Sequence, residues 1–345
     1  MRRHFLLLAL SLAPICAAAA EQAATDTAAR PLRERLNDLH AVGADHWIYN
    51  DLEKAKEAAR RENKPIFVTF RCVPCKSCAS FDAEVAKGSE LITTLARTQF
   101  IPLRLVEMKG VDLSQFEYDF DLNWAAMFIN ADGTVYGRYG TQSAQGPDAY
   151  NSVESLQKAM LRALDLHRAY PANAPQLAAK HPSKKPYATA LDMPGLDRKE
   201  RLRGQTERGN CIHCHNIHDA EQRQWLTEGK MSEDKLWRYP LPDNTGISID
   251  PKDGTRIATV LSGTPAEKAG LKTGDVVKQV NGQPVISIAD MQWVLHGLAN
   301  SGDKVAFTVA RGKDPVNATL ELAKDWKRSD ISWRGSMWSL RPRPG

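Results

Sequence analysis

The stretch PIFVTFRCVPCKSC, residues 65–78, joins an apolar run to three closely spaced cysteines. The run from Pro65 to Phe70 is rich in β-branched and aromatic residues and predicts a buried strand, and residues 79–85 predict a helix. A helix N-terminus lowers the pKa of a nearby thiol, and CxxC spacing lets one thiol resolve a mixed disulfide formed by the other. The pattern therefore predicts redox chemistry at three positions, Cys72, Cys75 and Cys78.

Strands and helices alternate on both sides of this stretch. We expect a helix to begin near Asn50, which can cap it, with Glu53 three residues on as in a capping box. The Asp132-Gly133 pair predicts a hairpin turn. The other predicted elements are strands at 100–106, 125–129 and 134–139 and helices at 91–97 and 149–169. Together they indicate a small α/β layer fold.

Residues 45–169 resemble the thioredoxin superfamily, because NKPIFVTF before the cysteines and CASFDAEV after them are similar to its exported members. The resemblance implies that Cys75 is the exposed nucleophile and Cys78 the resolving thiol. A second register pairs Cys72 with Cys75 and reproduces the proline and lysine of the family's CGPCK. Thr69 replaces a buried acid of the family, and Trp124-Ala125 replaces a cis-proline that shields the thiols from metals. Metal binding by the cysteines and an inert disulfide are therefore alternatives.

The chain contains a second cysteine pattern, the CxxCH of Cys211, Cys214 and His215. In this pattern both thiols can bond covalently to haem c, and the histidine can ligate the iron. The segment RGQTERGNCIHCH resembles class I cytochromes c in this respect, with a helix expected at 200–208 and Met231 as the candidate distal ligand. A structural disulfide is one alternative. The other is a zinc site formed by the same three residues with His213 or His218.

The sequences SGTPAEKAGLKTGDVV at 262–277 and VNGQPV at 280–285 closely resemble PDZ domains of bacterial periplasmic proteases over residues 240–323. The resemblance implies that a partner peptide adds as a strand and that a loop binds its carboxylate. That loop would consist of Asn244, Thr245, Gly246 and Ile247. The opposite wall of the groove would be a helix over 288–298, with Ala289, Trp293 and His296. A PDZ domain used only for intramolecular packing is the alternative.

The N-terminus has the pattern of a signal peptide over residues 1–20. Basic residues at positions 2–4 precede a short apolar run, Phe5 to Ile15, and small residues, Ala18 to Ala20, follow it. The apolar run is shorter than a membrane span, and so is every later apolar stretch. We therefore expect export to the periplasm, with an uncleaved anchor as the alternative. The net charge of +5 is dispersed and does not indicate nucleic-acid binding.

The chain thus predicts a multidomain protein of α/β plus α+β class. A Pro/Ala/Lys-rich linker at 170–186 and a short helical CxxCH segment at 187–239 separate the two domains, and a Trp/Arg-rich tail follows at 324–345. This order resembles a family of bacterial exported thioredoxin–PDZ proteins. The predicted function is a periplasmic thiol–disulfide oxidoreductase or electron-transfer protein whose PDZ groove recruits a protein or peptide, with a redox protein as a further partner. The alternatives are a non-enzymatic PDZ adaptor and a metal carrier.

Overall fold

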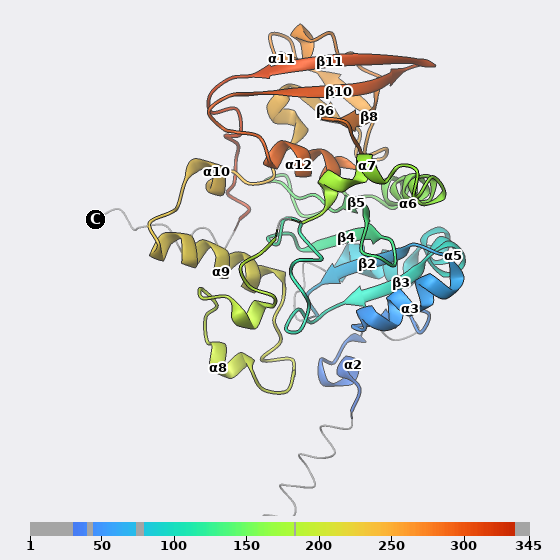
Figure 1. Cartoon of the computed structure of the whole chain (residues 1–345), viewed down its shortest axis with the longest axis vertical. Coiled ribbons are helices and arrows are strands. Elements are labelled where there is room, and N and C mark those ends of the chain that lie inside the picture. The colour runs from blue at the N-terminus through green and yellow to red at the C-terminus, as the bar shows by residue number, and fades with distance from the viewer. Residues whose placement is uncertain (1–29, 40–43, 74–78, 183, 335–345) are drawn as a thin grey trace, which may run out of the picture.

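A five-stranded sheet organises the N-terminal half of the chain (Figure 1). The structure, a computed structural model, describes residues 30–39, 44–73, 79–182 and 184–334. The strand order is β1-β3-β2-β4-β5, in which β1, β2 and β3 run parallel and β4 and β5 run antiparallel to their neighbours. The strands are β1 Ile48–Tyr49, β2 Ile66–Arg71, β3 Ile101–Leu105, β4 Trp124–Ile129 and β5 Val135–Tyr139.

The central strand β2 is buried on both faces of the sheet, so a separate layer of side chains packs on each face. Successive side chains of a strand point to opposite faces. Phe67 packs with α4 (Ala79–Ala83), α5 (Glu90–Gln99) and α6 (Val153–Arg168) in one core cluster. Val68 and Phe70 pack on the other face with α3 (Leu52–Glu62) and with residues from 190 to 220. The predicted strand and its flanking helices are therefore present.

The start of α3 differs from the sequence-based expectation. Asp51, not Asn50, caps the helix, and its side chain accepts a hydrogen bond from the backbone amide of Lys54 at 3.0 Å. Asn50 has a left-handed backbone with φ of 56°. Its side-chain oxygen accepts from the backbone amides of Val106 and Glu107, both at 2.9 Å. Asn50 therefore fixes the segment after β3 and does not begin a helix.

The stretch predicted to be an extended linker is folded and partly buried. It forms α7 (Ala174–Leu177) and a 3-10 turn (Ala178–Lys180), with Leu177 and Lys180 almost fully buried. Residues 187–239 follow, and their part up to Ala220 packs on the second face of the sheet. Their elements are a 3-10 turn at Ala190–Asp192, α8 Lys199–Leu202, α9 Cys214–Thr227 and α10 Glu233–Leu236. The helix expected at 200–208 is only the four-residue α8.

The C-terminal half forms two small antiparallel sheets around its own core. One sheet pairs β6 with β7, and the other has the order β11-β10-β8-β9. Trp326, from the predicted tail, is part of this core. The elements are a 3-10 turn at Pro242–Thr245, β6 Ile247–Ile249, β7 Ile257–Val260, α11 Pro265–Lys268, β8 Val276–Val280, β9 Gln283–Pro284, α12 Ile288–His296, β10 Asp303–Arg311 and β11 Asp314–Leu322.

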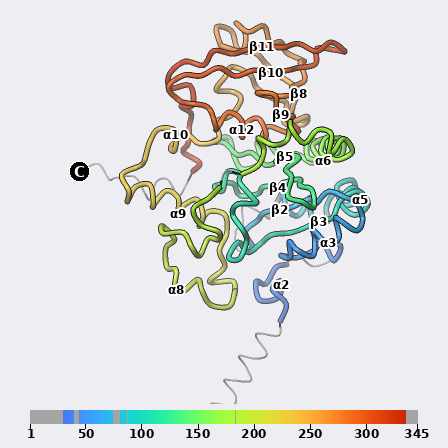
Figure 2. The backbone as a smooth tube through the Cα atoms, in the orientation of Figure 1, coloured from blue at the N-terminus to red at the C-terminus, as the bar shows by residue number. Residues whose placement is uncertain are grey.

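Helix α12 joins the two halves, and in Figure 2 it lies between β5 and the C-terminal strands. The carboxylate of Asp290 accepts from the backbone amide of Arg138 at 3.0 Å, and it forms an ion pair with Lys180 at 2.9 Å. Gly137 permits this approach, because a Cβ there would lie 2.4 Å from the Ile286 side chain. Arg138, Lys180 and Asp290 are all buried, so this contact fixes the orientation of the two halves.

We expect the substitution Asp290→Ala to lower the free energy of unfolding by about 3–5 kcal/mol, because it leaves the buried Lys180 without its partner. Urea denaturation followed by circular dichroism measures the change. Lys304→Ala, which removes an exposed ion pair with Glu321, is the matched control and should leave the midpoint unchanged. Equal midpoints for Asp290→Ala and the control would show that the contact does not hold the two halves together.

Candidate functional site

The predicted cysteine cluster lies at the carboxyl-terminal end of the central strand. β2 ends at Arg71, Cys72 follows it and is buried, and α4 begins at Ala79. The cluster therefore occupies the connection from β2 to α4. Cys75 and Cys78 lie outside the described residues, so the choice between the two CxxC registers stays open.

A buried network of charges lies directly beside Cys72. Arg71 pairs with Asp38 and, through Nε, with Asp82 at 3.1 Å. Arg104 from β3 reaches the same oxygen of Asp82 at 2.5 Å, and the Trp124 indole donates to its other oxygen at 3.2 Å. Burial alone would raise the pKa of Asp38, but the adjacent Arg71 guanidinium holds it below its usual value. This network fixes the end of β2 and the start of α4 against each other.

Sequence reasoning missed this network, although it noticed the loss of an acid at Thr69. The Thr69 hydroxyl is buried and donates to the carbonyl of Leu103 at 3.5 Å. A buried acid is nevertheless present near the cysteines, because α4 supplies Asp82. An acid at the fourth residue of a helix is an ordinary sequence feature, and only its buried cationic partners distinguish Asp82.

The second cysteine pattern lies against the thioredoxin-like sheet, near the same edge. The carbonyl of Ile212 accepts from the backbone amide of Met108 at 2.8 Å, and the Ile212 amide donates to Glu107 at 2.9 Å. Cys214 begins α9 and packs in the sheet core, with its sulfur 3.0 Å from the Tyr118 hydroxyl. Cys211 packs with Leu36 and Val106. The pattern is thus anchored on the segment that follows β3.

Both sulfurs of this pattern are thiols in environments that favour the protonated form. Burial raises the pKa of Cys214 to about 11. Burial, together with the nearby carboxylate of Glu107, also raises the pKa of Cys211. A protonated thiol is a weak nucleophile and a weak metal ligand. Among the described residues, no group of three or more His, Cys, Asp or Glu side chains is arranged to hold a metal ion, so the structure does not support the zinc alternative.

The residues of the CxxCH pattern do not present a surface that fits haem. Nε2 of His215, which would ligate the iron, lies 3.0 Å from the Asp121 carbonyl oxygen. Cys211 and Cys214 belong to separate apolar clusters. A cavity of about 360 Å³ does open at Cys211, but arginines line much of it. Haem c therefore stays a prediction that would require this segment to rearrange.

Met231 is also poorly placed for the distal ligand assigned to it. It follows the C-terminal end of α9, whereas His215 is in the first turn of that helix. A helix of 14 residues is about 21 Å long, so Met231 and His215 lie at opposite ends. The structure does not bring them together, and no step of the function proposed below uses haem.

Two of the residues predicted to line the PDZ groove, Trp293 and His296, contact other residues of the chain. Trp293 stacks on Arg138 with 3.7 Å between the guanidinium carbon and the ring centre, and its indole donates to the Ala179 carbonyl at 3.1 Å. His296 stacks on Tyr239 with 4.2 Å between ring centres. Ala289 lines a small cavity between α12 and the sheet. Trp293 and His296 thus make contacts within the chain, and their part in a peptide groove stays a prediction.

The predicted carboxylate loop precedes β6 and is well ordered by its contacts. The Asn244 side-chain amide donates to the carbonyl of Trp326 at 3.0 Å, and the Thr245 hydroxyl donates to the Pro242 carbonyl at 2.7 Å. Gly246 has φ of 97°, and a Cβ there would lie 2.2 Å from Thr264. Glycine is therefore required at this position, and Ile247, which is buried, begins β6.

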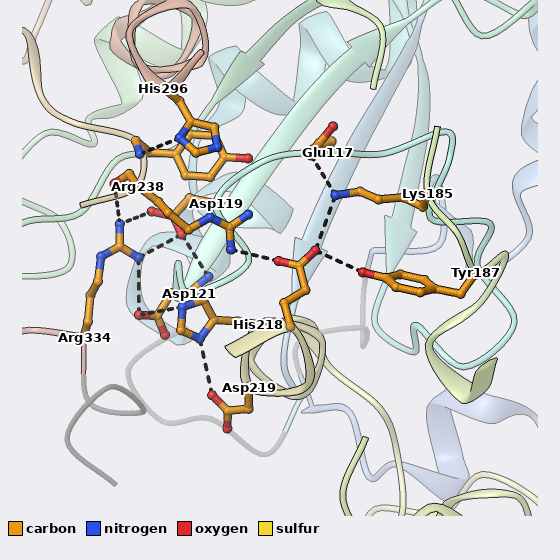
Figure 3. Close-up of polar contacts among 12 residues, drawn as sticks. Glu117, Asp119, Asp121, Lys185, Tyr187, His218, Asp219, Arg238, His296 and Arg334 are labelled. Carbon is orange, nitrogen blue, oxygen red and sulfur yellow. Dashed lines mark hydrogen bonds and ion pairs between the residues drawn. The ribbon is translucent and has the colours of Figure 1, made fainter. Parts of the chain in front are cut away.

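A second buried charge network joins the CxxCH segment and the tail to the segment that precedes β4 (Figure 3). Arg334 of the tail donates to Asp119 at 2.5 Å and to Asp121 at 3.4 Å. Arg238 donates to Glu221 of α9 at 2.8 Å. Burial alone would raise the pKa of Asp119, but Arg334 lowers it to about 2. The network joins four segments that are distant in sequence, and no local pattern reveals it.

The fold and the cysteine cluster define a thioredoxin-like module joined to a PDZ module. A thioredoxin-like family model matches residues 47–130, and a PDZ domain model matches residues 243–322. The sequence-based predictions of these two domains are therefore confirmed. Within the described part of the chain, no helix is long and apolar enough to cross a membrane.

The chain is similar to short regions of several curated proteases. It is 34% identical over 85 residues to a probable periplasmic serine endoprotease DegP-like of Pseudomonas putida, covering 25% of this chain and 15% of that protein. It is 42% identical over 69 residues to the serine protease Do-like HtrB of Bacillus subtilis, covering 19% and 15%. The aligned region thus spans less than a sixth of the length of either relative.

A solved structure, that of the HtrA3 PDZ domain bound to a phage-derived ligand (FGRWV), is 21% identical to this chain. The matched region covers 19% of this chain and 60% of the solved chain, with a TM-score of 0.17.

The partly buried His296 predicts a specific dependence of stability on pH. Burial and the nearby Arg238 lower its pKa from 6.5 to about 3. Between these values the unfolded chain binds a proton that the folded chain does not, so stability falls as the pH falls. His296→Gln should reduce this slope by about 1.4 kcal/mol per pH unit between about pH 4 and 6. Urea titrations across this range measure it, with the exposed His181→Gln as control; an unchanged slope would contradict the prediction.

Proposed function

We propose that this chain is a thiol–disulfide exchange protein whose reactive thiols belong to the cluster of Cys72, Cys75 and Cys78. The observation that carries the proposal is the position of the cluster, between the carboxyl end of the buried strand β2 and the start of α4. Polar and reactive groups at this edge of an α/β sheet are exposed to partners while the strand holds them in place. A helix that begins directly after the cysteines favours the thiolate.

The chemistry is a two-electron exchange with a substrate disulfide. The Cys75 thiolate attacks one sulfur of that disulfide and releases the other as a thiol. Cys78 then attacks the mixed disulfide, which forms the Cys75–Cys78 disulfide and releases the substrate as a dithiol. The register that pairs Cys72 with Cys75 uses the same two steps with different sulfurs.

The buried charges next to Cys72 support this role by making the site rigid. The Asp82 carboxylate forms ion pairs with Arg71 and Arg104 and accepts a hydrogen bond from the Trp124 indole. These three partners come from three different strands. A site held by buried ion pairs keeps its geometry through a reaction that changes the charge of a neighbouring sulfur. Removing one partner would leave a buried charge uncompensated.

We further propose that the chain acts outside the cytoplasm and that its PDZ domain binds a peptide. The signal-peptide pattern and the word periplasmic in the name of the Pseudomonas putida relative support export. Within the described sheets β6 pairs only with β7, so its other edge can accept a peptide strand. Since Trp293 and His296 already make contacts within the chain, we expect peptide recognition to depend on the loop around Gly246 and on this strand edge.

The thiol-exchange proposal predicts that the purified mature chain reduces insulin in the presence of dithiothreitol. Cys75→Ser removes the proposed nucleophile and should lower the rate at least tenfold, to the background of dithiothreitol alone. Turbidity of the precipitating insulin B chain measures the rate. The surface variant Lys304→Ala should match the wild type. Full activity in Cys75→Ser with loss of activity in Cys72→Ser would instead assign the nucleophile to Cys72.

The peptide-binding proposal predicts that the full chain binds a fluorescent FGRWV peptide with a free carboxylate. Gly246→Ala places a methyl group against Thr264 in a left-handed backbone conformation, so it should weaken binding at least tenfold. Fluorescence anisotropy measures the affinity, and the same peptide with an amidated C-terminus is the control. Unchanged insulin reduction by Gly246→Ala would show that the variant is folded. Equal binding of free and amidated peptides would contradict carboxylate recognition by this loop.

A further inference from the structure

The cavity of about 360 Å³ beside Cys211 has no part in the function proposed above. We propose that this cavity binds a small organic molecule that carries two or more carboxylate or phosphate groups. Small-molecule sites in proteins typically have volumes of about 300–1,000 Å³. The site uses side chains of the CxxCH segment and none of the first cysteine cluster, so it is separate from the proposed thiol exchange.

The wall of the cavity has an excess of positive charge. Its charged residues are four arginines and two aspartates: Arg198, Arg201, Arg208, Arg223, Asp197 and Asp219. Arg198 and Asp197 form an ion pair with each other at 3.4 Å. Asp219 contacts the His218 ring, with 3.3 Å between Oδ1 and Nδ1. Three arginines therefore share a cavity with a single further aspartate, which favours an anionic ligand.

These three arginines have carbonyl partners, and in the described part of the chain none of them forms an ion pair with a carboxylate. Each donates a hydrogen bond to a backbone oxygen: Arg201 to Gly209 at 3.0 Å, Arg208 to Leu36 at 2.9 Å and Arg223 to Gly195 at 2.8 Å. A carbonyl orients a guanidinium group but does not neutralise its charge. The remaining N–H groups can bind a carboxylate or a phosphate in the bidentate geometry that arginine favours.

The N-terminus of α9 adds neutral donors to the same cavity. His213, which precedes the helix, and Asn216, in its first turn, both line the cavity. The Asn216 side-chain oxygen accepts from the His213 amide at 3.0 Å, which leaves its NH2 group to donate to a ligand. Burial lowers the pKa of His213 to about 4, so His213 is uncharged near neutral pH. The positive end of the helix dipole also favours an anion here.

The arginines come from separate segments, so a single small ion would not contact all of them. Arg201 is in α8 and Arg208 precedes Cys211. Arg223 lies nine residues after Cys214 in α9, a rise of about 14 Å along the helix axis. Between them the wall is partly apolar, with Leu196, Leu202 and Cys211. A carbon skeleton with separated anionic groups fits this distribution better than inorganic phosphate does.

Contacts on two sides fix the shape of the cavity. The segment with α8 lies beside α9 (Figure 1). Gly195 packs so closely on α9 that a Cβ there would lie 2.0 Å from the Ala220 carbonyl oxygen. On the other side, the Lys109 side chain donates to the Gly204 carbonyl at 2.8 Å. The cationic groups are thus positioned before a ligand binds, which lowers the entropic cost of binding.

Isothermal titration calorimetry of the full mature chain tests the site with two probes. Citrate presents carboxylates, and fructose 1,6-bisphosphate presents two separated phosphate groups. At least one of them should bind ten times more tightly than inorganic phosphate, and neutral sorbitol should not bind. The preferred probe identifies the chemical class of the anionic groups. Added salt should weaken the binding, because Arg201 and Arg208 are exposed and their charges are screened.

Two variants locate the binding in this cavity. Arg223→Gln and Arg201→Gln each remove a charge-assisted hydrogen bond to the ligand, so each should weaken binding of the preferred probe at least tenfold. Arg203→Gln is the matched control, since Arg203 lies two residues from Arg201 and pairs with the exposed Glu200 at 3.7 Å. It is outside the residues that line the cavity and should leave the affinity unchanged. Unfolding midpoints from circular dichroism show that each variant is folded.

Three results would overturn the proposed site. The first is that neither probe binds more tightly than inorganic phosphate. The second is an equal loss of affinity in Arg203→Gln and the two cavity variants, which would indicate attraction to the net charge of the chain. The third is a c-type haem on Cys211 in protein made in a haem-maturing periplasm, because haem would fill the cavity. The titration contains no disulfide substrate, so none of these results decides the thiol-exchange function.

Discussion

Burial of β2 on both faces is the constraint on which the rest of the structure depends. Phe67 and Phe70, on opposite faces, are each about 1% exposed or less, so the sheet requires an apolar layer on each side. Helices α4, α5 and α6 supply one layer. Helix α3 supplies only part of the other, and residues from Ala190 to Ala220 complete it. The CxxCH segment is therefore part of the thioredoxin-like core and not a separate module on a tether.

Charges buried between the layers then fix how the segments meet. Apolar contacts are non-directional and would allow the packed segments to shift relative to each other. A buried carboxylate is specific, because losing its cation strongly destabilises the fold. Asp290 binds α12 to Arg138 and Lys180, and Asp119 binds the tail through Arg334. These pairs cover one face of α12 with the thioredoxin-like domain, so the PDZ domain and the redox fold share an interface. A peptide that binds at β6 would therefore bind to a PDZ domain that is packed against the thioredoxin-like domain.

More of the fold than of the candidate site could be predicted from the sequence. The strand at 66–71, the hairpin around Gly133 and the PDZ turns follow local rules of periodicity and turn chemistry, and they were predicted closely. The extended linker was wrong, because composition does not show that Leu177 and Lys180 are buried by other segments. The network of Arg71, Asp82 and Arg104 was missed for the same reason, since each residue is unremarkable in its own stretch.

By itself the sequence determined which chemical groups are present and what local structure surrounds them: three cysteines between a strand and a helix, a second CxxC, and a glycine in the loop at 244–247. Only the tertiary structure decided which of these groups are neighbours. It placed Cys211 and Cys214 beside the strand that leads to Cys72, and it turned Trp293 toward Arg138. Such proximity results from covering both faces of a sheet, which depends on contacts between distant residues that no local pattern encodes.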